Sequence, residues 1–160
     1  MSLMKHLIYK KLCIGILVAS ILLLAPGCGW SWFCSWFGGH MKQEMKIKEI
    51  TAEDLQKRMK ESESLLVLNV LSKDSFEDCH IKGSFNVPLN TLEQTAKSWH
   101  KDREIVVYCA SYMCHASVEA YKKLKSLGFN NVFAYEGGTK EWKAKGFPTE
   151  GSCAADYLKT

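Results

Sequence analysis

From residue 45 onward, short strand-like segments alternate with stretches of helical spacing. Most of these segments are apolar runs bounded by polar or turn residues, which is typical of buried strands. The pattern predicts strands at residues 45–50, 65–70, 84–87, 104–108 and 131–135.

Helical patterning occupies the intervening segments. Thr51 and Asp54 form a capping box, which predicts a helix reaching about Met59. Residues 116–127 place four apolar side chains on one helical face, and Gly128 provides the stop. Shorter helical segments are expected at residues 75–79, 91–99 and 138–145. The alternation predicts an α/β fold, with a mostly parallel five-stranded sheet and helices on both faces.

In such sheets, functional sites form beyond the carboxyl ends of the strands, and Cys109 lies at one of these ends. Cys114 follows where the next helix begins. A tight loop between a strand and a helix directs backbone N–H groups inward, which favours the thiolate form of a cysteine held there. Taken alone, the two cysteines have four possible roles: they could form half of a metal site, form a structural disulfide, supply a nucleophilic thiol or simply be small buried side chains.

Three motifs decide between these alternatives. They are His80-Ile81-Lys82-Gly83-Ser84-Phe85-Asn86-Val87-Pro88, then Val106-Val107-Tyr108-Cys109, and finally Glu136-Gly137-Gly138 with Trp142, Gly146 and Pro148. In this order they resemble the conserved segments of a single rhodanese (sulfurtransferase) domain, which would cover residues 47–150. The resemblance implies that Cys109 is catalytic and starts a six-residue loop whose amides stabilise a persulfide. The other loop residues are Ala110, Ser111, Tyr112, Met113 and Cys114.

The resemblance further implies an enzyme that carries a sulfane sulfur on Cys109 and needs no cofactor or metal. The donor would be polysulfide, thiosulfate or a protein persulfide, and the acceptor a thiol or another nucleophile. Asn69-Val70-Leu71 departs from the Asp-Val-Arg of many relatives, which suggests the paired loss of an internal ion pair. Because the loop holds no cation, we expect weak use of thiosulfate, a dianion. For His80 and Trp142 we expect structural roles, in a turn and in the core.

Two other functions remain as alternatives. Cys114 could act as a resolving thiol, which would make the chain an extracytoplasmic dithiol/disulfide redox protein. The fold could also serve as a non-catalytic binding module. Cysteine phosphatase chemistry is disfavoured, because His115 stands where that class needs a bidentate arginine.

The first 28 residues have the layout of an export signal. Lysines precede an apolar core from Leu12 to Leu24, and the segment ends in Ala25-Pro26-Gly27-Cys28. This end resembles a bacterial lipobox, which predicts lipidation of Cys28. An uncleaved anchor is the alternative, because no charge occurs from Leu12 to Gly39. Both interpretations predict a membrane-anchored, extracytoplasmic domain, on the periplasmic side or at the cell surface.

Charge and composition add little beyond this. The 160-residue chain has a net charge of +4, but three of its lysines lie in the apolar N-terminal segment. No basic patch with interleaved aromatic residues indicates nucleic-acid binding, and no Cys-x-x-Cys pair indicates a zinc site. The predicted organisation is a signal peptide or anchor at 1–27, a tether at 28–45, a rhodanese-like domain at 46–150 and a C-terminal tail at 151–160.

Overall fold

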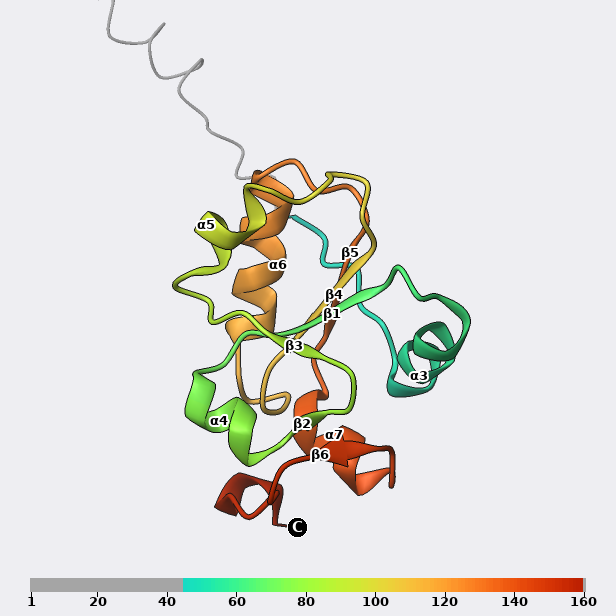
Figure 1. Cartoon of the computed structure of the whole chain (residues 1–160), viewed down its shortest axis with the longest axis vertical. Helices are drawn as coiled ribbons and strands as arrows, with labels where there is room; N and C mark the ends of the chain where they lie inside the picture. Colours follow the sequence, from blue (N-terminus) through green and yellow to red (C-terminus); the bar gives the residue numbers. More distant parts are fainter. Residues whose placement is uncertain (1–44, 160) are drawn as a thin grey trace, which may run out of the picture. The chain divides into compact units, whose positions relative to one another are not determined.

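The computed structural model describes residues 45–159. In this part of the chain the main sheet has four parallel strands in the order β3-β1-β4-β5 (Figure 1). Their bounds are β1 Leu66–Asn69, β3 Phe85–Asn86, β4 Ile105–Tyr108 and β5 Val132–Tyr135. The register sets Asn69 opposite both Asn86 and Tyr108, and Tyr108 opposite Tyr135. The carboxyl ends of all four strands therefore form one row.

The predicted first strand, at residues 45–50, is wrong, so the main sheet of residues 45–159 has four strands rather than five. This segment makes only an isolated parallel bridge between Glu49 and Ala134. The Ile50 N–H donates to the Ala134 carbonyl at 3.1 Å, and the chain then enters a helix capped by the Thr51 hydroxyl. Because helix capping begins at Thr51, two residues after the bridge at Glu49, no ladder can extend.

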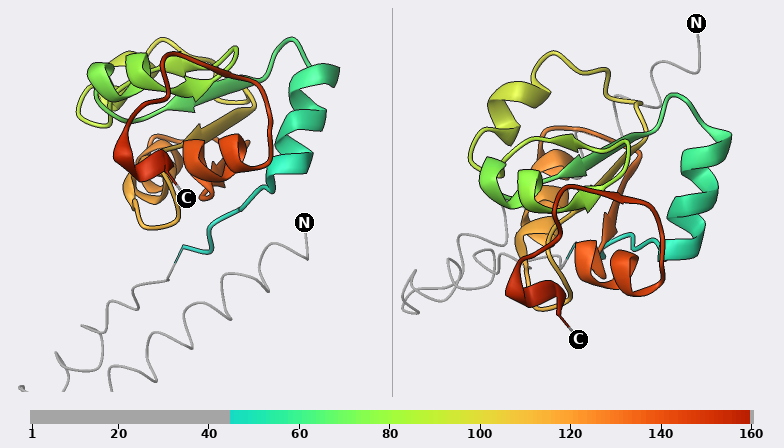
Figure 2. Two further views of the ribbon diagram at one scale, coloured as in Figure 1. Left: turned by 90° about the horizontal axis from the view of Figure 1, so that it is seen from below. Right: turned by 60° about the horizontal axis from the view of Figure 1, so that its bottom comes forward.

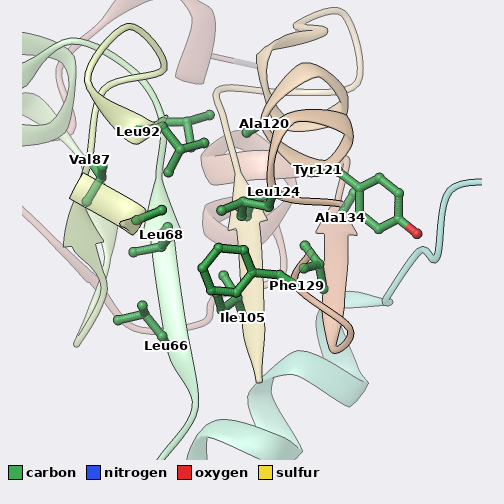
Figure 3. Packing of buried hydrophobic residues seen from close by; sticks show 14 of the residues in the cluster. Leu66, Leu68, Val87, Leu92, Ile105, Ala120, Tyr121, Leu124, Phe129 and Ala134 are labelled. Atoms are coloured by element: carbon green, nitrogen blue, oxygen red, sulfur yellow. The ribbon is translucent and has the colours of Figure 1, made fainter. Parts of the chain in front are cut away.

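Helices cover both faces of the sheet, as predicted. Their bounds are α3 Ala52–Glu61, α4 Lys73–Asp78, α5 Leu92–Ala96, α6 Ala116–Ser126 and α7 Gly138–Ala144. Leu92, Ala120 and Leu124 bring α5 and α6 onto one face, where Leu124 and Phe129 lie over β4 and β5 (Figure 3). Leu55 and Trp142 bring α3 and α7 onto the other face.

Strand β4 connects both faces with the site. Its side chains alternate, as the pleat of a strand requires. Ile105 and Val107 pack in the cluster beneath α5 and α6, whereas Val106 and Tyr108 pack in the cluster beneath α3 and α7. Cys109 continues this alternation and belongs to the α5/α6 side.

A second, antiparallel sheet pairs β2 (His80–Ile81) with β6 (Thr149–Glu150), and the pattern analysis missed it. Beyond β6, the 3-10 helix η1 (Asp156–Leu158) ends the described chain. A disulfide joins Cys79 to Cys153, with a Cα–Cα distance of 4.5 Å. The segment after residue 150 is thus covalently tied to the domain.

The predicted signal or anchor at residues 1–27 and the predicted lipidation site Cys28 lie outside the described residues. Among the helices of residues 45–159, none has the length and apolarity to cross a membrane.

Candidate active site

Cys109 comes directly after β4 and is fully buried, and both it and Cys114 carry free thiols. The Cys109 Sγ lies 2.9 Å from the Cys114 carbonyl oxygen and 3.9 Å from that of Ser111. The Ser117 hydroxyl, on the first turn of α6, lies 3.4 Å away. Two of these three neighbours can only accept a hydrogen bond, so the arrangement suits a protonated thiol that donates.

The electrostatics agree with that geometry. Burial raises the pKa of the Cys109 thiol, the Ser117 hydroxyl lowers it, and Cys114 raises it again. The expected bias toward thiolate is therefore wrong for this resting arrangement. The main cause is burial, and the Ser117 N–H and hydroxyl, which lower the pKa, do not outweigh it beside the two carbonyl oxygens.

The start of the loop is fastened to the N-terminus of α7. Thr139 and Lys140 donate their N–H groups to the carbonyls of Cys109 and Ala110, at 3.1 and 2.9 Å. Gly138 has φ +64°, and a Cβ there would lie 2.5 Å from the Ala110 carbonyl carbon. The second glycine of the terminal motif is thus required by the close approach of two backbones.

The middle of the loop faces solvent. Tyr112 and Met113 are 63% and 87% exposed, while Cys114 is half-buried. The Tyr112 hydroxyl donates to Glu141 Oε2 at 3.1 Å, and Tyr135 donates to the same oxygen at 3.0 Å.

A cavity of about 250 Å³ beside Tyr112 has an acidic lining. The carboxylates around it belong to Glu49, Glu53, Asp54, Glu136 and Glu141. Lys145 pairs with two of these carboxylates, Glu53 and Glu141, and the loop itself contains no lysine or arginine. The rim therefore keeps an excess of negative charge, which disfavours a small dianion.

An uncharged network replaces the ion pair of many relatives. Asn69 is fully buried, and its Oδ1 accepts from the Leu71 N–H at 2.9 Å. Asn86 donates its side-chain amide to the Leu71 carbonyl at 3.0 Å. The Tyr108 hydroxyl lies 2.7 Å from the Ser84 hydroxyl and accepts from the Ile81 N–H at 3.0 Å. These contacts hold the ends of β1, β3 and β4 together without a charge.

His80 and Trp142 have the structural roles expected for them. His80 bridges the Phe76 carbonyl, 2.8 Å from Nδ1, and Glu150, 3.3 Å from Nε2. Trp142 is 2% exposed and donates its indole N–H to the Pro148 carbonyl at 2.9 Å. Neither side chain contacts the Cys109 thiol.

Sequence reasoning missed Ser117 and Thr139, which are both fully buried and polar. Their positions eight and thirty residues after Cys109 give no local signal. Within residues 45–159, no group of three His, Cys, Asp or Glu side chains is arranged to hold a metal ion.

Comparison with known proteins places this geometry in a family. The model of the rhodanese-like domain matches residues 51–145. The chain is 30% identical over 110 residues to YrkF of Bacillus subtilis, covering 68% of this chain but only 58% of YrkF. It is 26% identical over 99 residues to the thiosulfate sulfurtransferase GlpE of Coxiella burnetii, covering 62% of this chain and 87% of GlpE.

Among solved structures, the rhodanese-like domain of the Anabaena protein Alr3790 is 32% identical, with a TM-score of 0.60. The likeness covers 69% of this chain and 84% of that structure. The family match spans more than half of the chain, from the cap of α3 to the end of α7, and includes Cys109 and its loop. The chain therefore belongs to the rhodanese-like domain family.

Proposed function

We propose that this protein is a sulfurtransferase that carries a sulfane sulfur as a persulfide on Cys109. The observation that carries the proposal is a free, buried thiol at the carboxyl end of β4, inside a loop pinned to α7. Relatives named for sulfur transfer support the same reaction class at the level of the family.

The reaction takes two displacements. In the first, the Cys109 thiolate attacks the outer sulfur of a polysulfide; the Cys109–sulfur bond forms, the sulfur–sulfur bond of the donor breaks, and a shortened polysulfide leaves with the electron pair. In the second, an acceptor thiolate attacks the terminal sulfur and Cys109 leaves as thiolate. No external oxidant or reductant is needed, because each step exchanges one sulfur–sulfur bond for another.

The donor we propose is a polysulfide or a protein persulfide rather than thiosulfate. Thiosulfate presents two negative charges, and the loop from Ala110 to Cys114 offers no cation to receive them. The acidic cavity beside Tyr112 adds repulsion. An inorganic polysulfide is also an anion, but its charges lie at the two ends of the chain rather than on one compact group, so the repulsion at the reacting end is smaller.

Intact mass of the full chain after incubation with inorganic polysulfide tests the proposal. We expect a stable gain of one sulfur atom that Cys109→Ser abolishes, because a hydroxyl cannot form a persulfide. Cys114→Ser is the matched control and should retain the gain. If Cys109→Ser gains sulfur as the wild type does, the assignment of the carrier is wrong.

A dithiol redox function is the second candidate. The contact of the Cys109 Sγ with the Cys114 carbonyl brings the two residues together. Attack of the Cys114 thiolate on a Cys109 persulfide would form a disulfide and release hydrosulfide. The mass experiment separates the two functions, since a wild type that loses two protons and gains no sulfur favours the redox candidate.

For the location, we propose a membrane-tethered domain in an oxidising compartment. Support comes from the lysine-led apolar N-terminus ending in Cys28 and from the Cys79–Cys153 disulfide, a bond that persists mainly outside the reducing cytosol. Cys28→Ala should leave an unprocessed precursor and weaken membrane retention if Cys28 is lipidated. Unchanged mature size and unchanged membrane association would instead favour an uncleaved anchor.

A further inference from the structure

The residues after α7 form a C-terminal strap, which we define as residues 149–158. The strap begins with β6, ends with η1 and lies beyond the span matched by the family model. Its last part reaches the same end of the molecule as the loop before α6 (Figures 1 and 2). The family match therefore gives no account of a segment that lies close to the proposed site.

The strap is fastened at several points. Cys153 is bonded to Cys79, and its carbonyl accepts from the Lys143 ammonium at 2.9 Å. The Asp78 carboxylate accepts from the Ser152 hydroxyl at 2.7 Å. It also accepts from the backbone N–H groups of Ala154 and Ala155, each at 3.2 Å. These contacts fix the path of the chain into η1.

Tyr157, in η1, has an unexplained polar atom. Its hydroxyl is buried and makes no hydrogen bond of normal geometry within residues 45–159, because the nearby Thr139 hydroxyl donates to the Cys109 carbonyl instead. A buried hydroxyl without a good partner destabilises the folded state and calls for an explanation. A partner that is present only in another state of the site would supply one.

The surroundings of that hydroxyl connect it to the Cys109 end of β4. η1 packs against α7, and the Thr139 side chain beside the Tyr157 hydroxyl is itself bonded to the Cys109 carbonyl at 3.4 Å. Burial raises the pKa of Tyr157, the Thr139 hydroxyl lowers it, and the nearby charges of Asp78, Cys109 and Cys114 raise it. The hydroxyl thus stays protonated and lies within electrostatic range of both thiols.

The chemistry of the proposed cycle requires a donor at this place. At rest the Cys109 sulfur donates toward carbonyl oxygens. A thiolate or a persulfide anion can only accept hydrogen bonds, and those oxygens would repel it. The Ser117 hydroxyl is one donor in reach, and the buried Tyr157 hydroxyl, beside the Thr139 side chain that bonds to the Cys109 carbonyl, is available as a second. A hydrogen bond from the Tyr157 hydroxyl to a sulfur anion would give the anion a donor and the buried hydroxyl an acceptor.

We propose that Tyr157 belongs to the active site and donates a hydrogen bond to the sulfur anion carried by Cys109, and that the Cys79–Cys153 disulfide holds it there. The proposal rests on the sulfur-carrier function of Cys109. Oxidised Cys79–Cys153 keeps the donor in place. Reduction of this disulfide releases the strap, and the sulfur anion on Cys109 then loses the hydrogen bond that stabilises it.

The test is the rate of alkylation of Cys109 by iodoacetamide as a function of pH, followed by peptide mass in the full, oxidised chain. Tyr157→Phe keeps the ring and the disulfide and removes only the hydroxyl. Because a hydrogen bond to a charged group is worth about 1.5–3 kcal/mol, we expect alkylation at neutral pH to slow about tenfold or more and the profile to move to higher pH. Tyr121→Phe is the matched control, since its hydroxyl bonds to the Lys46 carbonyl instead.

The charged or titratable groups nearest Tyr157 are Asp78, Tyr108 and the two loop thiols, with Lys143 beside Asp78. Elsewhere on the strap, Glu150 pairs with His80 and Lys82, and Asp156 pairs with Lys159. Only the hydroxyl differs between wild type and Tyr157→Phe, so a shift of the Cys109 profile reports its donation. An unchanged profile overturns the proposal.

A double substitution of Cys79 and Cys153 by serine tests the part played by the disulfide. It should shift the profile as Tyr157→Phe does, and combining it with Tyr157→Phe should add little. A wild-type profile without the disulfide would overturn the holding role. Alkylation needs no sulfur donor, so failure of Cys109 to gain sulfur from polysulfide is a separate result that overturns only the function on which this proposal rests.

Discussion

At the scale of single residues, the central question is how a buried thiol that faces oxygen acceptors becomes a nucleophile. Cys109 is shielded from water, and its sulfur touches the carbonyls of Cys114 and Ser111. This arrangement holds the sulfur in its protonated form until a base removes the proton and hydrogen-bond donors stabilise the thiolate. Protection of a reactive thiol between turnovers is one consequence, and a requirement for local donors during turnover is another.

The raised pKa of Cys109 gives a pH prediction. Because the folded state binds the thiol proton more tightly than the unfolded chain, the thiolate fraction is small at neutral pH. The rate of sulfur loading should therefore keep rising through about pH 8.5, where an ordinary thiol is half ionised. The same linkage removes the stability contribution of this protonated thiol as pH rises above that point. A loading rate already level at pH 6 would contradict the shift.

Ser117 supplies the opposing influence. Its hydroxyl, 3.4 Å from the Cys109 Sγ, lowers the pKa of the thiol. Ser117→Ala should slow sulfur loading about tenfold at neutral pH and recover part of the loss at high pH. Ser126→Ala is the control, because that exposed hydroxyl bonds only to the Lys123 carbonyl at the far end of α6. Equal loading rates in the two variants would show that Ser117 does not stabilise the thiolate.

At the scale of elements, the site depends on how closely α7 approaches the loop after β4. Two N–H groups at the start of α7 hold the first two loop carbonyls, and Gly138 makes that distance possible. The glycine motif is therefore part of the architecture of the loop. A side chain at this position would push the loop and Cys109 away from the donors around them.

Gly138→Ala tests this element. Its Cβ would meet the Ala110 carbonyl carbon at 2.5 Å, in addition to the strain of φ +64°. Gly146→Ala is matched in backbone, with φ +71°, but no described atom lies within 4 Å of its Cβ. We expect Gly146→Ala to cost about 1 kcal/mol of unfolding free energy and Gly138→Ala about 2–3 kcal/mol or more, measured by urea titration. Equal losses of unfolding free energy in the two variants would mean that the loop moves away from the new Cβ without destabilising the fold.

At the scale of the whole described chain, the disulfide closes the fold by joining residues 74 positions apart. It ties the residue before β2 to the part of the strap just after β6, and so stabilises the small sheet that those strands form. Loss of the bond with both cysteines replaced by serine should lower the free energy of unfolding by about 2–5 kcal/mol. The wild type should lose a similar amount on reduction, and a reductant should leave the double variant unchanged. A wild type insensitive to reductant would contradict this role.

Only part of the described fold could be predicted from the pattern of apolar and polar residues. β1, β4 and β5 are buried at every position, so their apolar runs marked them clearly, and Cys109 followed from the end of one run and the family motif. The Cys79–Cys153 pair could not be predicted, because nothing local relates cysteines so far apart. The first predicted strand failed because a helix cap at Thr51 competes for the chain beside a single bridge. The orientation of the Cys109 sulfur depends on the curl of the loop and had no signal in the pattern.

The most direct measurement of the central claim is single-turnover transfer from the loaded protein. Full-length wild type is loaded with polysulfide, freed of donor and mixed with an excess of a small thiol such as glutathione. We predict that one sulfur atom per chain leaves Cys109, that an equal amount of glutathione persulfide forms, and that the protein returns to its starting mass. Loaded protein that keeps its sulfur in the presence of the thiol, or releases it equally in Cys109→Ser, would contradict the account.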